Sequence, residues 1–104
     1  MYRILIVEDN EKIRMELCDF LSKNGYLSEG CSNFQHILED ITSRKPDLIL
    51  LDLNLPVTDG HFICKELLKT SNVPIIIVTS RNSDIDELQS MHLGADDYVT
   101  KPYN

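Results

Sequence analysis

The sequence predicts an α/β domain in which a parallel sheet carries helices on both faces. Three short aliphatic runs, at residues 4–7, 48–51 and 75–78, contain no alternating polar residues, a pattern typical of strands that are buried on both faces. Segments with helical spacing of apolar residues lie between these runs. Strands and helices that alternate from the first residue indicate parallel strands joined by helical crossovers.

Four helices are predicted from apolar residues three or four positions apart. Their apolar positions are, in chain order, Ile13, Leu17, Phe20 and Leu21; Phe34, Ile37, Leu38 and Ile41; Ile63, Leu67 and Leu68; and Ile85, Leu88, Met91 and Leu93. Gly25 and Gly94 are suited to end the first and fourth helices. Weaker strand patterns at residues 26–30 and 97–100 complete a sheet of five strands. We expect Phe20, Phe34 and Phe62 to lie in the core.

Length and charge restrict the function classes. A chain of 104 residues forms one domain, which we place at residues 1–104. Its 17 acidic and 10 basic residues give a net charge of -7, which argues against a nucleic-acid-binding surface in this domain. Three widely spaced cysteines support neither a disulfide framework nor a metal site, and we expect free thiols. No signal peptide or membrane span is apparent, so we expect a cytoplasmic protein that does not contact a membrane.

Polar side chains follow the predicted strands at the point where each strand ends. Because ligands bind beyond the carboxyl ends of the strands in an open α/β sheet, these side chains are expected to share one rim. The rim residues are Glu8, Asp9, Asp52, Thr79, Ser80 and Lys101. Three neighbouring carboxylates repel one another unless a cation neutralises them, and Mg²⁺ suits oxygen ligands. With a hydroxyl and an amine opposite the metal, the rim suits phosphoryl transfer, in which Asp52 would be the nucleophile.

Four segments carry a resemblance to the response-regulator receiver domain of two-component signalling systems. They are ILIVEDN, DLILLDLNLPVTDG, PIIIVTSR and GADDYVTKP, which begin at residues 4, 47, 74 and 94. Each segment alone is weakly specific, but four in this order at this spacing are strongly specific, and the resemblance covers essentially the whole chain. It implies a flavodoxin-like, doubly wound sheet of five parallel strands in the order 2-1-3-4-5.

The resemblance also implies a role for each rim residue. Asp52 resembles the acceptor of a phosphoryl group from a histidine kinase, and Lys101 resembles the lysine that pairs with that carboxylate and then with the phosphoryl group. The implied Mg²⁺ ligands are Asp9, Asp52, the backbone carbonyl of Asn54 and, through water, Glu8. Thr79 and Tyr98 resemble the family's switch residues. The resemblance places further residues in loops and turns: Pro56, Asp59, Gly60 and, after a cis peptide bond, Pro102.

The last matching segment is similar to that of OmpR/PhoB-type regulators, which carry a winged-helix DNA-binding domain. No segment remains for a fifth helix, so we expect a receiver truncated before that helix and an intact protein that continues into a DNA-binding domain. The resemblance implies a homodimer through the 83–104 face after phosphorylation, with Asp96 and Asp97 as candidates for its salt bridges. DNA would be contacted by the full-length protein and not by this domain.

Three other functions make different demands on the same residues. An aspartyl phosphatase would need a general acid two residues after the nucleophile, and Asn54 cannot donate a proton in that way. A flavin or nucleotide carrier would need a phosphate-binding loop after the first strand, where the acidic segment EDNEK stands instead. A stand-alone receiver that acts only by protein contact is a further alternative, which the presence of all the rim groups disfavours. We expect no enzyme beyond the self-phosphorylation and autodephosphorylation of a receiver.

Overall fold

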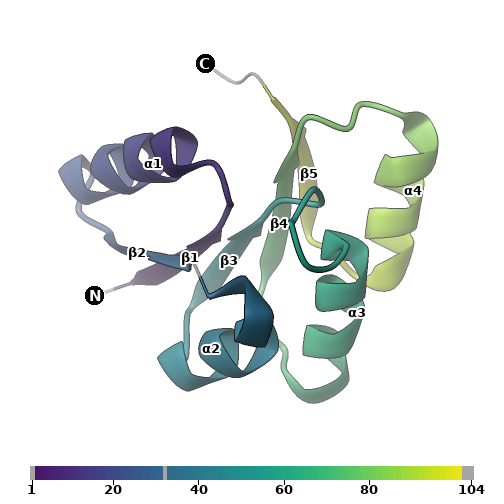
Figure 1. Ribbon diagram of the computed structural model, residues 1–104, viewed down its shortest axis with the longest axis horizontal. Coiled ribbons are helices and arrows are strands. Elements are labelled where there is room, and N and C mark those ends of the chain that lie inside the picture. The colour runs from purple at the N-terminus through teal and green to yellow at the C-terminus, as the bar shows by residue number, and fades with distance from the viewer. Residues whose placement is uncertain (1, 32, 102–104) are drawn as a thin grey trace.

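The computed structural model describes residues 2–31 and 33–101. Its strands form one parallel sheet in the order β2-β1-β3-β4-β5 (Figure 1). They are β1 (Arg3–Val7), β2 (Leu27–Cys31), β3 (Leu48–Leu51), β4 (Ile75–Thr79) and β5 (Asp97–Thr100). The predicted fold class and strand order are confirmed, and each strand boundary lies within one residue of its predicted position.

The helices connect the strands as predicted. They are α1 (Glu11–Lys23), α2 (Ile37–Arg44) with a preceding 3₁₀ turn η1 (Phe34–His36), α3 (Gly60–Thr70) and α4 (Asp84–Leu93). Side-chain oxygens cap three of them: Asn10 accepts from the N–H of Ile13, Asp59 from that of His61, and Ser83 from that of Asp86. At the end of α4, Gly94 has a φ of 111°, which favours glycine.

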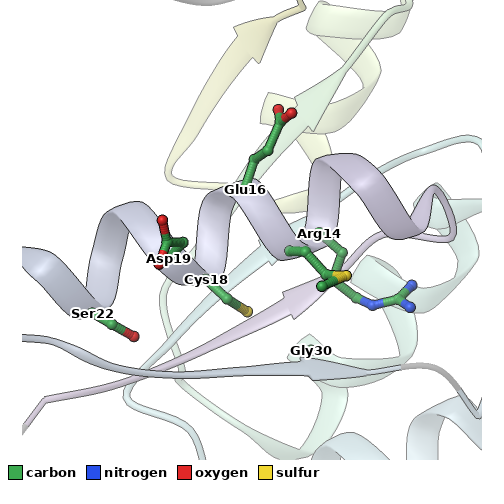
Figure 2. A pocket seen from close by; sticks show the side chains of 7 residues that line it. Arg14, Glu16, Cys18, Asp19, Ser22 and Gly30 are labelled. Carbon is green, nitrogen blue, oxygen red and sulfur yellow. The ribbon is translucent and has the colours of Figure 1, made fainter.

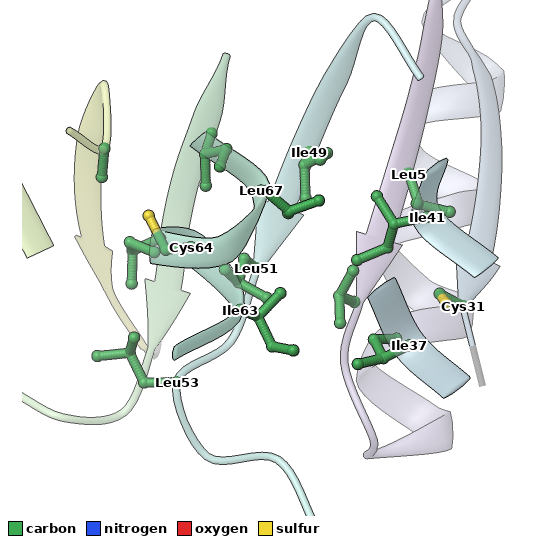
Figure 3. Packing of buried hydrophobic residues seen from close by; sticks show 14 residues of the cluster. Leu5, Cys31, Ile37, Ile41, Ile49, Leu51, Leu53, Ile63, Cys64 and Leu67 are labelled. Atoms are coloured by element: carbon green, nitrogen blue, oxygen red, sulfur yellow. The ribbon is translucent and has the colours of Figure 1, made fainter. Parts of the chain in front are cut away.

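The main core lies between the sheet and the pair α2 and α3 (Figure 3). Its fully buried members include Leu5, Ile41, Ile49, Leu51, Ile63 and Ile77. Side chains alternate across a strand, so Ile4 and Ile6 point to the opposite face, where α1 contacts β1 and β2. On that opposite face Leu50 and Ile76, which are paired across β3 and β4, are only half-buried.

The expectation that three phenylalanines lie in the core was wrong for two of them, since only Phe34 packs against it. Phe20 and Phe62 are 62% and 50% exposed, although both were expected inside. The apolar stripe of α1 runs through positions four apart, and Phe20 lies beside that stripe and not on it. In α4 three of the four predicted apolar residues point outward, with Ile85 and Leu88 more than 70% exposed and Met91 42% exposed, while Leu93 packs against the core. Periodicity identifies a helix, but the packing decides which side of it is covered.

The cysteines are free, as predicted: Cys31 and Cys64 are buried and Cys18 is half-buried. Burial, together with a hydrogen bond from the Cys31 thiol to Asp40 (2.9 Å), raises the pKa of Cys31 to about 12 from its ordinary value of 9.0. Above pH 9 the unfolded chain therefore loses this proton while the native state keeps it.

We expect this thiol to lower stability in alkali. Its contribution is constant below pH 9, and stability then falls by about 1.4 kcal/mol per pH unit as the pH rises from 9 toward 12. Urea unfolding of the wild type and of Cys31→Ser across this range measures the difference in slope. Equal slopes for the two proteins would contradict the assignment.

In the part of the chain that the structure describes, no helix combines the length and the apolar composition required to cross a bilayer.

Candidate functional site

Three carboxylates meet at the carboxyl end of the sheet. Glu8 and Asp9 follow β1, and Asp52 follows β3, where its N–H bonds the Val7 carbonyl (3.0 Å) and so extends the strand pairing to the rim. Glu8 and Asp52 are buried and Asp9 is exposed, and the three residues offer oxygen atoms within 4.8 Å of one another. The convergence expected from the strand ends is present in the structure.

Lys101 supplies the positive charge opposite these carboxylates. Its N–H bonds the Thr79 carbonyl (2.7 Å), which fixes the end of β5 beside β4. The Nζ lies 3.2 Å from Asp52 Oδ2 and donates a further hydrogen bond to Glu8 Oε1. Burial lowers the pKa of Lys101, but the two carboxylates outweigh it and leave the pKa above its ordinary value. The sequence suggested Asp52 as the partner of Lys101 and missed Glu8, because no pattern reports which rim residues touch.

Burial raises the pKa of Glu8, and the nearby Asp52 charge acts in the same direction against hydrogen bonds from Lys101 and the Asn10 N–H. One lysine thus faces two buried carboxylates and an exposed third. The donor set of hard oxygens with excess negative charge fits a divalent cation such as Mg²⁺. The residues of this chain are therefore chemically suited to the metal that the sequence indicated.

Asn54 lies in the loop after β3, two residues past Asp52. Its N–H donates to Asp52 Oδ1 (3.2 Å), and its side-chain amide donates to the Ser80 hydroxyl (3.3 Å). Thr79 ends β4 and is completely buried, and its hydroxyl accepts from the N–H of Arg81 (3.3 Å). The structure thus brings the predicted site residues from β1, β3, β4 and β5 to one rim.

Tyr98 lies in β5, half-buried against the core. Its hydroxyl donates to the backbone carbonyl of Arg81 (2.6 Å), so the ring is packed toward the loop between β4 and α4. Burial raises the pKa of the Tyr98 phenol, and the nearby Asp86 carboxylate raises it further. The tyrosine therefore remains a hydrogen-bond donor at neutral pH.

Arg81 is the functional candidate that sequence reasoning missed. Its Nε donates to Asn54 Oδ1 (2.7 Å), and one terminal nitrogen donates to Asp59 Oδ2 (2.7 Å). The other terminal nitrogen reaches Asp86 Oδ1 (3.4 Å). The only hint in the sequence is its place two residues after Thr79, which says nothing of partners more than 20 residues away.

The residues predicted for the loop after β3 divide between loop and helix. Pro56 is exposed in the loop, and Asp59 caps α3. Gly60 is the first residue of α3 and not a loop residue, because the Asp59 carboxylate starts the helix there. The Arg81 ion pair and the His61 N–H keep the pKa of Asp59 below its ordinary value despite partial burial, which by itself would raise it. Pro102, with its predicted cis bond, lies outside the described residues.

The two acids proposed for a dimer face are exposed. The Asp96 carboxylate accepts from the N–H of Ile75 (2.8 Å), so it already completes the start of β4. Asp97 accepts from the N–H of Tyr98 (2.7 Å). Among the described residues, the Asp97 carboxylate bonds only the N–H of the next residue, whereas the Asp96 carboxylate bonds the start of β4.

A separate hollow of about 640 Å³ lies between α1 and β2, away from the rim (Figure 2). Arg14 crosses this region beside Gly30 and donates to the backbone carbonyl of Glu8 (2.8 Å). A Cβ at Gly30 would lie 2.6 Å from Arg14 Cδ, so the glycine leaves room for the arginine. Arg14 therefore supports the backbone of Glu8 from the side of α1.

Comparison with known proteins agrees with this geometry. The family model of the response regulator receiver domain matches residues 4–104. Among curated relatives, the sensory transduction protein BceR of Halalkalibacterium halodurans is 41% identical over the whole chain, and the transcriptional regulatory protein BaeR of Escherichia coli is 44% identical over 98% of it. The chain spans only 45% and 42% of these two proteins.

Solved structures give the same result. The BeF3-activated receiver domain of Klebsiella pneumoniae RstA is 32% identical with a TM-score of 0.92, over 98% of this chain and 87% of that one. The chemotaxis protein CheY4 of Vibrio cholerae is 27% identical with a TM-score of 0.90, over 100% of this chain and 89% of that one. The matched family, the strand order and the carboxylate rim together show that this chain belongs to the response regulator receiver domains of two-component systems.

Proposed function

We propose that this receiver accepts a phosphoryl group on Asp52 from a sensor histidine kinase and relays the event through its C-terminal face. The observation that carries the proposal is the convergence of Glu8, Asp9 and Asp52 within 4.8 Å, with Lys101 bonded to two of them. In the transfer step an Asp52 oxygen attacks phosphorus. An acyl-phosphate bond forms, and the bond from phosphorus to the donor breaks with its electron pair leaving on the donor.

Each residue has a proposed task in that step. Asp9, Asp52 and the Asn54 carbonyl would hold Mg²⁺ directly and Glu8 through water, and the ion would neutralise the transferring group when bound. Lys101 neutralises the acceptor carboxylate before the transfer and the phosphoryl oxygens after it. The Thr79 hydroxyl would follow a phosphoryl oxygen, and movement of its loop would carry the Arg81 carbonyl that Tyr98 binds.

The regulatory function controlled by this receiver is proposed for the full-length protein and not for this domain alone. The names of the relatives describe transcriptional regulators and sensory transduction proteins, of which this chain spans less than half. We therefore propose a cytoplasmic regulator that contacts DNA through another domain, and a phosphorylation-dependent homodimer through residues 83–104 with Asp97 in its contacts. The phosphatase alternative is not favoured, since the family match and Asn54 both oppose it.

Incubation with acetyl phosphate tests the acceptor directly. Intact mass is expected to show an alkali-labile gain of one phosphoryl group that requires Mg²⁺ and is absent from Asp52→Asn. Asp19→Asn removes an exposed carboxylate from α1 and is expected to be labelled like the wild type. Labelling of Asp52→Asn, or a wild type that gains no mass with Mg²⁺, would refute the proposed function.

A further inference from the structure

α4 is attached to the domain by few apolar contacts. Ile85, Leu88 and Met91 face outward, Leu93 is the one apolar residue of the helix that packs against the core, and Ser90 is its only buried residue. Helices of globular proteins are usually held by a buried apolar face. Hydrogen bonds and ion pairs must therefore do more to hold α4 in place than they do for a helix with a buried apolar face.

Two polar contacts hold α4, which we call ties, and the first of them is a buried hydrogen bond between α3 and α4. The Ser90 hydroxyl lies 2.7 Å from His61 Nε2 in α3, and Ser90 and His61 are 0% and 7% exposed. A buried hydroxyl that lost this partner would pay the full cost of desolvation, so the bond holds the two helices in one arrangement. On the other side of the ring, His61 Nδ1 is 3.5 Å from Asp59 Oδ1, which also accepts the His61 N–H (2.8 Å).

A second polar tie lies nearer to the solvent. Arg81 contacts Asp86 in the first turn of α4 and also pairs with Asp59 Oδ2. Both ties therefore lead from α4 to the same carboxylate. Arg81 also donates a hydrogen bond to the side chain of Asn54. The backbone N–H of the same asparagine donates to the carboxylate of Asp52.

We propose that Asp59 is the junction through which the acceptor loop positions α4, with His61–Ser90 and Arg81–Asp86 as the two ties. This inference rests on the proposed phosphorylation of Asp52. A phosphoryl group changes the carboxylate oxygens that Asn54 binds, so Asn54 and the Arg81 side chain must readjust. Because α4 has little apolar anchoring of its own, it follows the movement of its polar partners.

Hydrogen exchange of the α4 amides, read by mass spectrometry in Mg²⁺ with and without beryllofluoride, tests the junction. In the wild type, beryllofluoride is expected to change α4 exchange. Ser90→Ala removes only the hydroxyl, and alanine favours helix, so any loosening reports the lost tie. We expect exchange to rise about five-fold to ten-fold without beryllofluoride and the response to beryllofluoride to shrink toward none.

Two further variants sharpen the test. His61→Leu combined with Ser90→Ala is expected to raise exchange no more than either change alone, since both remove the same bond. Gln89→Ala, an exposed change in the same helix, is expected to leave exchange and response as in the wild type. The proposed junction would be overturned if the two substitutions raised α4 exchange additively. It would also be overturned if beryllofluoride changed α4 exchange in Ser90→Ala as much as in the wild type.

The two proposals fail in different ways. A wild type that is labelled by acetyl phosphate on Asp52 but shows no α4 response to beryllofluoride would overturn the junction and leave the proposed function intact. A wild type that is not labelled and does not respond would refute both.

Discussion

Replacing Lys101 with methionine is expected to lower the free energy of unfolding by about 3 kcal/mol at neutral pH. The Lys101 side chain is 13% exposed, and its Nζ is the hydrogen-bonded cation of two carboxylates that are themselves 4% and 6% exposed. Methionine keeps the apolar part of the lysine side chain, so the lost stability can be attributed to removal of the positive charge. Removal of one partner leaves Glu8 and Asp52 buried and uncompensated, which is the costly way to break a buried ion pair.

Urea unfolding measures this loss of stability, and unfolding in the presence of Mg²⁺ provides a second, independent test. In Lys101→Met a divalent cation has more uncompensated negative charge to bind, so added Mg²⁺ is expected to stabilise the variant more than the wild type. Lys23→Met is the matched control, since its ion pair with Asp19 (3.0 Å) is mostly exposed and is expected to matter little. A Lys101→Met protein as stable as the wild type without Mg²⁺ would contradict the assigned ion pair.

Replacing Gly60 with alanine is expected to destabilise the domain by about 3 kcal/mol, although alanine is the better helix former. A Cβ at this position would lie 2.4 Å from the Asp52 carbonyl oxygen and 2.5 Å from Leu53 Cα. Both atoms belong to the backbone just after β3, so they cannot move aside as a flexible side chain can. The first turn of α3 and the backbone of Asp52 would be forced apart.

The Gly60→Ala substitution is also expected to affect phosphorylation. Because the displaced backbone carries Asp52, phosphoryl labelling of Gly60→Ala by acetyl phosphate is expected to be slower than that of the wild type. Gly25→Ala is the control: its Cβ has open space, and its φ of 88° costs about 1 kcal/mol without touching the rim. Equal stability of the two alanine variants would show that the close approach at Gly60 is tolerated.

Much of the fold was predictable because it follows from local patterns. Fully apolar runs identified the central strands, and glycines marked the helix ends. The rim was predictable for a topological reason, since parallel strands bring their carboxyl ends together whatever the loops do. The sequence alone therefore predicts that Glu8, Asp9, Asp52 and Lys101 share one site.

Predictions failed where the outcome depended on which side of an element is covered. Phe20, Phe62 and the outer residues of α4 fit a helical period but face outward. A moderately amphipathic helix offers more than one stripe, and the choice is made by what packs against it. The same reason conceals Ser90, a polar residue that is the buried one in α4.

The sequence by itself determined the alternation of strands and helices and the group of side chains around Asp52, because these follow from local patterns and from residues next to strand ends. The strand order came from the resemblance to the receiver family, and the structure has the same order. Only the tertiary structure decided the partners across the chain: Lys101 with Glu8, Arg81 with Asn54 and Asp59, and His61 with Ser90. These contacts join residues 22 to 93 positions apart. No local period encodes such distances, and they arise only when the loops and helices take their places around the finished sheet.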